Sequence, residues 1–494
     1  MHALEITDIA RWQFGIITVY HFLFVPLTIG LSAIVALMQT IWLRTKNDDW
    51  LRLTKFIGKL FLINIAMGVV TGIVQEFQFG MNWSAYSRFV GDIFGAPLAI
   101  EALLAFFMES TFIGLWIFGW DRVPRKVHVV FIWLVHLGTL ASSWFILAAN
   151  SWMQHPVGYV YDKATGRAEL TDFWAVMFNK VQLGTFPHVI AASYMTAAVF
   201  LVGVCGFLYG KRSQQAAAGS ATPDGAEPSA TSRDREMYAR GIRLGAAISV
   251  IAFLGVAFSG DVQGKIMTDV QPMKMAAAEA LWDTSDSCAP FSAFTIGTRD
   301  GTHKKFAVEV PCLLSFLATG HFDQKVEGIN DLQAQYEQQY GPGNYKPIIP
   351  VTYWSFRWMM GLGAAGVAGA VLLAWMTRKR RTPTWRWYSW IVVLAPLWVL
   401  LGNGVGWVFT EMGRQPWVVF GLMQTADAAS PNVSTTEAWI SITALAALYA
   451  VLAVVEVGLL LKFIRKGADA YVEPPDLTWK DLKNDDDQPL TFAY

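Results

Sequence analysis

Nine apolar segments of this chain are each long enough to cross a lipid bilayer as a helix. The segment from Trp387 to Phe409, for example, carries no acidic or basic side chain, and about 20 such residues span the hydrocarbon core. Only 15% of the residues are charged, against about a quarter in soluble proteins. The sequence therefore predicts an all-α integral membrane protein. The predicted spans cover residues 12–43, 56–75, 93–120, 127–149, 186–209, 242–259, 353–376, 387–409 and 439–463.

The orientation of the bundle follows from its basic loops. Lys and Arg gather in alternate connections, as at Arg44 and Lys46 after the first span and at Arg378–Arg381 after the seventh. Such loops favour the cytoplasmic side. We therefore expect the N-terminus outside and the C-terminus in the cytoplasm. We expect no cleavable signal peptide, because the first apolar run is too long for one and follows charged residues.

The polar segments between the spans differ in composition. An Ala/Ser/Gly/Pro-rich stretch predicts a flexible linker. The long outer segment is mixed, with several aromatic residues and a helical pattern near Asp331–Tyr340, so we expect an ordered extracytoplasmic cap. The predicted parts are 1–259 with spans one to six and a cytoplasmic linker at 211–236, 260–352 as the outer loop, 353–463 with the last three spans, and 464–494 as a cytoplasmic tail.

Four residues in the outer halves of separate spans have side chains that can bind haem iron or lie beside it. They are His21, His188, Met359 and Glu411. Imidazole and thioether are ligands that haem iron takes, and helix bundles build such sites in their cores. A single histidine is often only hydrogen-bonded, and we interpret His136 in that way. The joint pattern predicts cofactor binding near the outer face.

Two carboxylates, Glu101 and Glu109, lie in the third span. Eight residues of α-helix separate them by about 12 Å along the axis and about 80° around it. Carboxylates inside a membrane often relay protons. The pair therefore predicts a proton route from the middle of the membrane toward the cytoplasmic side.

The eighth span ends in a charged segment between two tryptophans, Trp407 and Trp417. It contains Glu411 and Arg414. One interpretation is an interfacial anchor in which the two charges pair. The other is a cofactor site, with Glu411 as a ligand or proton acceptor and Arg414 beside a propionate.

Two further pairs of residues stand out in the outer loop. Lys274 and Glu279 could hydrogen-bond the hydroxyls of a quinol and accept its protons. Cys288 and Cys312 lie where the compartment is oxidising and thiols tend to pair. We predict a disulfide that orders the cap.

Several motifs resemble subunit I of the cytochrome bd-type quinol oxidases, in the form with a short quinol-binding loop. The resemblance runs over essentially the whole membrane region. The most specific motifs are YHFLFVPLTIG (20–30), EFQFGMNWSAYS (76–87), GDIFGAPLAIEALLAFFMEST (91–111), SFRWMMG (355–361) and EMGRQPW (411–417).

This resemblance implies a role for each candidate. His188 and Met359 would be the axial ligands of a low-spin haem b, with Arg357 beside that haem. His21 and Glu411 would serve a high-spin haem b and a haem d, in either order. Four residues would line the oxygen-reducing site and its proton route: Trp407, Arg414, Glu101 and Glu109. Two residues would bind quinol: Lys274 and Glu279.

The resemblance also implies an activity and partners. Ubiquinol or menaquinol would be oxidised at the outer face, and O2 would be reduced to water with cytoplasmic protons, which generates a proton motive force without pumping. The chain would lie in the bacterial plasma membrane with a homologous second subunit, and small single-span subunits are compatible with it. The equal numbers of acidic and basic residues give no sign of a nucleic-acid partner.

Two other functions are open to a membrane protein of this kind. A proton-coupled transporter would also carry intramembrane carboxylates, but the spans show no internal repeat. A haem-b quinol dehydrogenase subunit would have the low-spin ligands without the Glu101–Glu109 pair and the EMGRQPW motif.

Overall fold

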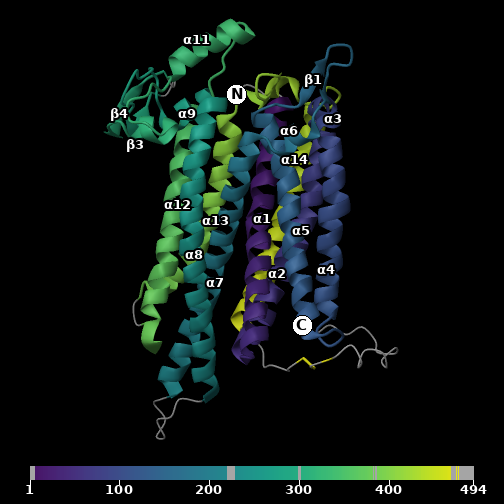
Figure 1. Ribbon diagram of the computed structural model, residues 1–494, viewed down its shortest axis with the longest axis vertical. Coiled ribbons are helices and arrows are strands. Elements are labelled where there is room, and N and C mark those ends of the chain that lie inside the picture. The colour runs from purple at the N-terminus through teal and green to yellow at the C-terminus, as the bar shows by residue number, and fades with distance from the viewer. Residues whose placement is uncertain are drawn as a thin grey trace.

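The chain forms a bundle of long helices with a small cap at one end (Figure 1). The computed structural model describes residues 6–219, 229–298, 302–381, 383, 386–468, 474, 475 and 477. Nine spans in these described ranges are long and apolar enough to cross a membrane. The prediction of an all-α protein with nine spans is therefore confirmed.

The spans are longer than the apolar runs that predicted them. The third combines α3 and α4 with a π-helix (η1) between them. In chain order the helices of the bundle are α1 (Ile6–Thr45), α2 (Asp48–Met81), α3 (Ser84–Ile100), η1 (Glu101–Phe106), α4 (Phe107–Phe118), α5 (Arg125–Gln154), α7 (Lys180–Gly219), α8 (Ser229–Val270), α12 (Ile349–Met376), α13 (Tyr388–Gly413) and α14 (Thr435–Lys466).

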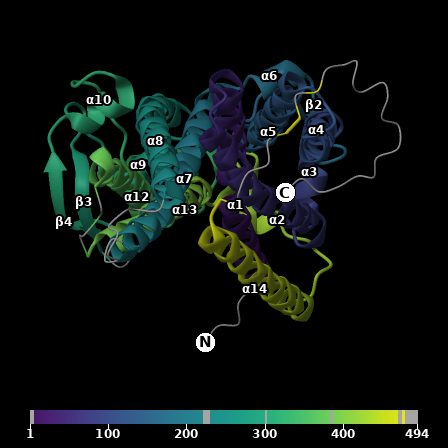
Figure 2. The ribbon, with the colours of Figure 1, turned by 90° about the horizontal axis from the view of Figure 1, so that it is seen from below.

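Helix α1 lies at the centre of the bundle and packs against α2, α5, α7, α13 and α14. Helices α7, α8, α12 and α13 lie on one side of it, and α3, α4 and α5 on the other (Figure 2). The approach of α1 to α7 requires glycine, because a Cβ at Gly30 would lie 2.3 Å from the carbonyl oxygen of Ser193. Helix α14 packs at the edge, against α1 and α2.

The cap, which we define as residues 271–348, covers one end of the bundle, here called the cap end; the opposite end is called the basic end (Figure 1). The predicted outer loop, 260–352, also includes the end of α8, which continues to Val270, and the start of α12 at Ile349. The predicted helix near Asp331–Tyr340 is present as α11. The elements of the cap are α9 (Pro272–Glu279), β3 (Phe291–Gly297), β4 (Lys304–Val310), α10 (Leu313–Thr319) and α11 (Ile329–Tyr340).

Two links hold the cap together. A disulfide joins Cys288 to Cys312. In the chain-entropy treatment, closing a loop of about 25 residues stabilises the folded cap by about 3–4 kcal/mol relative to its unfolded state. A buried cluster that includes Trp282, Tyr336 and Tyr353 packs the cap onto the start of α12. Strands β3 and β4 pair in antiparallel fashion.

The connection between α7 and α8 differs from the flexible linker expected at 211–236. Helix α7 extends to Gly219 and α8 begins at Ser229, while residues 220–228 lie outside the described residues. Ion pairs fix this region: Asp234 bonds Arg52 at 2.8 Å and Arg212 at 3.0 Å, which ties α8 to α2 and α7. Of the predicted tail, 464–466 belongs to α14, and most of the remainder lies outside the described residues.

Short elements in the connections were not predicted. Two antiparallel hairpins lie at the cap end of the bundle, and the others are a short helix and two 3-10 turns. They are β1 (Tyr159–Asp162), β2 (Arg167–Leu170), α6 (Phe173–Met177), η2 (Arg378–Arg380), β5 (Trp417–Val419), β6 (Met423–Gln424) and η3 (Thr425–Asp427).

Candidate functional site

The four candidate haem ligands lie in the cap-side halves of their helices. His21, His188 and Met359 follow the starts of α1, α7 and α12 at the cap end, and Glu411 precedes the end of α13 at Gly413. They come from four helices of one bundle.

His188 has one ring nitrogen engaged and faces α8. Its Nδ1 lies 3.1 Å from the Ser259 hydroxyl, which leaves Nε2 for a ligand. Such a hydrogen bond fixes the orientation of a histidine that binds a metal.

Met359 lies on α12, which packs against α7. The two helices meet where Met195 lies against Gly363. At about 1.5 Å per residue, His188 and Met359 lie about 10 Å and about 6 Å from that point, both toward the cap end. The Met359 sulfur packs against α13, since a Cβ at Gly406 would lie 2.9 Å from it.

His21 is held in a similar way by α2. Its Nδ1 lies 2.9 Å from the Thr71 hydroxyl, which leaves Nε2 available for a ligand. The neighbouring Phe22 ring lies 4.2 Å from the Trp407 ring, centroid to centroid. Trp407 precedes Glu411 by one helical turn, so α13 places both residues along the side of α1 that Phe22 contacts, whereas His21 itself faces α2.

Glu411 accepts hydrogen bonds from two side chains. Asn150 Nδ2 of α5 donates to Oε1 at 2.9 Å, and Arg414 Nη2 donates to Oε2. The Arg414 side chain is only 3% exposed, and its Nε and Nη1 are buried without a partner in the described part of the chain. Buried donors without acceptors are costly. The N–H groups of these two nitrogens therefore fit an anion such as a haem propionate, while the Glu411–Arg414 pairing of the interfacial-anchor interpretation is also present.

Glu101 and Glu109 both face α5, but their predicted angular relation is wrong. Residues 101–106 form a π-helix, so the 80° expected for a continuous α-helix does not apply. Ser142 Oγ donates to Glu101. Glu109 packs against Gly138, where an added Cβ would lie 3.0 Å from the Glu109 Cβ. π-Helical turns inside α-helices are frequent at functional sites.

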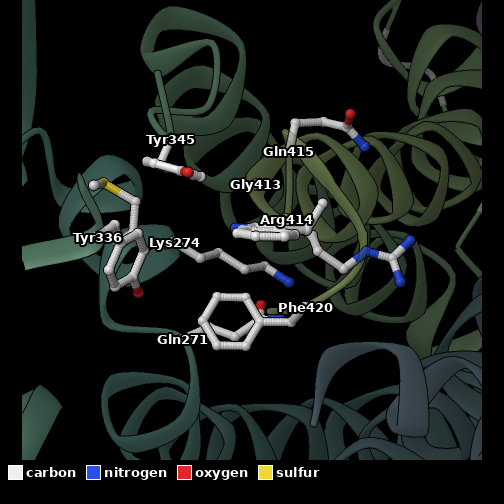
Figure 3. Close-up of a pocket in the computed structure, with 10 residues that line it drawn as sticks. Gln271, Lys274, Tyr336, Tyr345, Gly413, Arg414, Gln415 and Phe420 are labelled. Carbon is white, nitrogen blue, oxygen red and sulfur yellow. The ribbon is translucent and has the colours of Figure 1, made fainter. Parts of the chain in front are cut away.

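Lys274 is buried beneath the cap and lines a small recess where α9, α11 and the end of α13 meet (Figure 3). Its Nζ donates to Gln154 Oε1 at 3.0 Å and lies 5.3 Å from the centroid of the Phe409 ring. Burial lowers the pKa of Lys274 to about 7; Glu411 acts against this shift and Arg414 adds to it.

Glu279 lies on the same short helix as Lys274 and forms an ion pair with Arg357 of α12. The guanidinium donates to both carboxylate oxygens, at 2.7 and 3.3 Å, and to the Ser292 carbonyl. Burial raises the pKa of Glu279 to about 7, although Arg357 acts in the opposite direction. Arg357, which the resemblance assigned to a haem, therefore joins the cap to the helix that carries Met359.

Sequence reasoning missed the uncharged partners of the charged residues. Asn150, Gln154 and Ser142 lie on α5 and bond Glu411, Lys274 and Glu101. A signal existed in the spacing of Asn150 and Gln154, which are four residues apart and so share a helix face. The predicted span ended at residue 149, so both were treated as loop residues.

Within the described ranges no group of three or more His, Cys, Asp and Glu side chains could hold a metal ion by themselves. A haem iron takes only its axial ligands from the protein. The four candidate ligands, His21, His188, Met359 and Glu411, therefore fit haem sites rather than a site for a bare metal ion.

Comparisons with known proteins cover nearly the whole chain. Residues 9–468 match the profile of the family described as cytochrome bd terminal oxidase subunit I. The chain is 46% identical over 462 residues to cytochrome bd ubiquinol oxidase subunit 1 of Bacillus subtilis, covering 93% of this chain and 94% of that one. It is 34% identical over 527 residues to cytochrome bd-II ubiquinol oxidase subunit 1 of Escherichia coli, covering 94% and 98%.

The fold also matches a solved structure. The bd oxidase from Geobacillus thermodenitrificans superposes with a TM-score of 0.78 at 26% identity, over 94% of this chain and all of that one.

Proposed function

Because the chain belongs to the family of cytochrome bd terminal oxidase subunit I, we propose that its cap-side residues hold haem and that its cap binds the quinol that the oxidase consumes. Membership makes the chain part of a quinol-oxidising terminal oxidase. It also argues against the transporter and the dehydrogenase alternatives. The observation that carries the proposal is buried Arg414, which bonds Glu411 and retains the N–H groups of Nε and Nη1 for an anion.

The donor set fits three haems. His188 and Met359 would hold a low-spin haem b, and His21 and Glu411 a high-spin haem b and a haem d, in either order. In both histidines Nδ1 is engaged and Nε2 is available. When bound, the haems supply one-electron transfer and the reduction of O2.

The cap side chains would bind quinol and take its protons. Lys274 and Glu279 point from α9 toward different helices, α5 and α12. An ammonium can donate to a quinol oxygen, and an ionised carboxylate can accept a hydroxyl proton. Both groups lie at the cap end, which the basic loops at the opposite end assign to the outer side. Protons from quinol would therefore leave on that side.

Glu109 and Glu101 would bring protons from the basic end. Both face α5, with Glu109 nearer the basic end and Glu101 bonded to Ser142. Quinol protons released outside and protons taken up from the cytoplasm separate charge without a pump. This arrangement would generate a proton motive force across the bacterial plasma membrane.

A second membrane subunit would pack against the apolar surface that the bundle leaves exposed. Leu103 and Phe107 are 78% and 68% exposed on the face of η1 and α4, and Val454 of α14 is 75% exposed. The name of the relatives, subunit 1, agrees with such a partner. Small single-span subunits are compatible with the same surface.

A reduced-minus-oxidised absorption spectrum of the purified complex tests this function. We expect bands of haem b together with the far-red chlorin band of haem d. Haem b bands alone would support a quinol dehydrogenase subunit instead. A preparation without haem bands would support a transporter.

The pH dependence of quinol oxidation tests Glu279. Its pKa, raised by burial to about 7, means that the proton-accepting form increases as the pH rises through that value. We expect the rate of quinol oxidation to rise about tenfold per pH unit below pH 7 as Glu279 ionises. Above pH 7 the rate should fall, because Lys274, whose pKa is also about 7, loses the proton with which it binds quinol. Glu279→Gln should slow quinol oxidation at least about tenfold at pH 7.5 and remove the rise below pH 7.

The matched control is Glu309→Gln, because Glu309 lies on β4 and pairs with Lys304 at the surface of the cap. This variant should keep both the rate and the pH profile. An unchanged profile in Glu279→Gln would mean that another group accepts the quinol protons.

A further inference from the structure

Three consecutive hydrogen bonds join Lys274 in the cap to Glu411 in the membrane bundle. Lys274 Nζ donates to Gln154 Oε1 at 3.0 Å. Gln154 Nε2 donates to Asn150 Oδ1 at 2.8 Å, and Asn150 Nδ2 donates to Glu411 Oε1 at 2.9 Å. The two amides lie on successive turns of α5, so one helix carries the whole connection, here called the amide bridge (Gln154 and Asn150).

The direction of the amide bridge is set by its two ends. A charged Lys can only donate, so Gln154 must present its oxygen to Lys274. An ionised Glu can only accept, so Asn150 must present its amino group to Glu411. The remaining groups, Gln154 Nε2 and Asn150 Oδ1, then form the central bond. All four polar atoms are used, and both amide dipoles point the same way.

The cap-side half of the amide bridge is buried. Gln154 is 3% exposed and Lys274 is 1% exposed, while Asn150 is half-buried. The side chain of Gln271 donates to the backbone oxygen of Gln154 at 2.9 Å, which fixes the end of α5. Hydrogen-bond networks in such low-dielectric surroundings are stronger than in water, and their members depend on one another.

We propose that Gln154 and Asn150 are positioning residues that couple the quinol site to the Glu411 side of the haem site. This inference rests on the proposed function. A quinone or quinol oxygen that accepts from a second N–H of the Lys274 ammonium draws Nζ toward itself and weakens the bond to Gln154 Oε1. This change alters the orientation or strength of the bonds that reach Glu411, so occupancy of the cap alters the surroundings of the cofactor at Glu411 before any electron moves.

The amide bridge is separate from the other link between the cap and the bundle. Glu279 and Arg357 join the cap to α12, which carries Met359. Gln154 and Asn150 lie on α5 and reach α13. The two links therefore lead to different candidate ligands, and a substitution in the amide bridge leaves the Glu279–Arg357 pair in place.

The test uses the whole oxidase in its air-oxidised state, with oxidised ubiquinone-1 as the probe so that no turnover occurs. Ubiquinone-1 is titrated while the absorption bands of the haems are recorded, and its binding is measured separately by calorimetry. In the wild type we expect a saturable shift of the high-spin haem bands. In Gln154→Leu the amplitude at saturation should fall at least about fivefold, with the low-spin bands and the haem content unchanged.

The matched control is Gln182→Leu. Gln182 is fully buried and bonds Ser151 and the Trp144 carbonyl, both on α5 but outside the amide bridge. This variant should keep the wild-type shift. If Gln154→Leu does not assemble, Gln154→Glu serves instead, because an ionised Glu still accepts from Lys274 but cannot donate to Asn150.

The outcomes separate this inference from the function on which it rests. A full-amplitude shift in Gln154→Leu, or a wild type that binds ubiquinone-1 without any shift, overturns the coupling and leaves the oxidase function standing. A wild-type complex that lacks the bd haem bands overturns the proposed function itself. An equal loss of amplitude in Gln182→Leu would show a general effect of loosening α5 and would also overturn the coupling.

Discussion

Replacing His188 with Ala should remove the low-spin haem b from the purified oxidase, while the chain still inserts and folds. The imidazole is held at Nδ1 by Ser259, and Ala offers no atom that could replace Nε2 as an axial ligand. We expect the low-spin haem b bands to fall below about a tenth of the wild-type amplitude, since loss of a ligand costs more than the 10- to 100-fold caused by loss of its supporting partners.

The measurement is haem content and the reduced-minus-oxidised spectrum, with retention of the complex on gel filtration as the check on folding. Helices α7 and α8 pack along most of their lengths, so one truncated side chain near the cap end should not unfold them. His136→Ala is the matched control: His136 is buried on α5 and its two ring nitrogens bond Ser32 and Tyr194. It should lower stability and keep the haem. An unchanged low-spin spectrum in His188→Ala excludes His188 as a ligand.

The number of spans was predictable because a membrane imposes its thickness on the sequence. A run of apolar residues about 20 long has few alternatives to a transmembrane helix. The ends of the helices were not predictable in the same way. Helix α8 continues to Val270 past the apolar run that ended at 259, because polar residues outside the hydrocarbon core can extend a helix at no solvation cost.

The described ends of the segment at 211–236 show the limit of composition. The first end contains three consecutive Ala, at 216–218, which favour helix as much as flexibility, since Ala has the highest helix propensity. Contacts with other parts of the folded chain decide whether such a segment is helical or flexible. Arg233 bonds Asp48 and Asp49 of α2, both at 3.1 Å, and the sequence does not reveal that these residues, nearly 190 positions apart, meet.

The site was predictable in its charged members and not in their partners. His, Glu and Lys are conspicuous in or beside apolar spans because each is costly there. Burying an uncharged polar side chain costs less free energy than burying a charge. The sequence therefore does not distinguish Asn150, Gln154 and Ser142 from its other polar residues. Arg357 shows a second limit: the sequence does not reveal that Glu279 of the cap lies within 2.7 Å of it.

Replacing Glu109 with Gln should slow oxygen reduction by about 10²–10³-fold, a loss typical of a residue that transfers protons. Gln keeps the size of the side chain, so its packing against Gly138 is retained, but it cannot take up and release a proton. Glu109 lies on the basic-end side of Glu101 along the third span. Uptake should therefore fail at its first intramembrane carboxylate, while quinol oxidation at the cap is untouched.

Stopped-flow absorption separates the two halves of the reaction in Glu109→Gln. The rate at which quinol reduces the enzyme without O2 should stay within about twofold of wild type, and the reaction of the reduced enzyme with O2 should show the loss. Glu456→Gln is the matched control, because Glu456 is a buried carboxylate of α14 at the edge of the bundle. It should react with O2 at the wild-type rate. If Glu109→Gln instead blocks reduction by quinol and reacts normally with O2, Glu109 belongs to the quinol side and the two proton routes are exchanged.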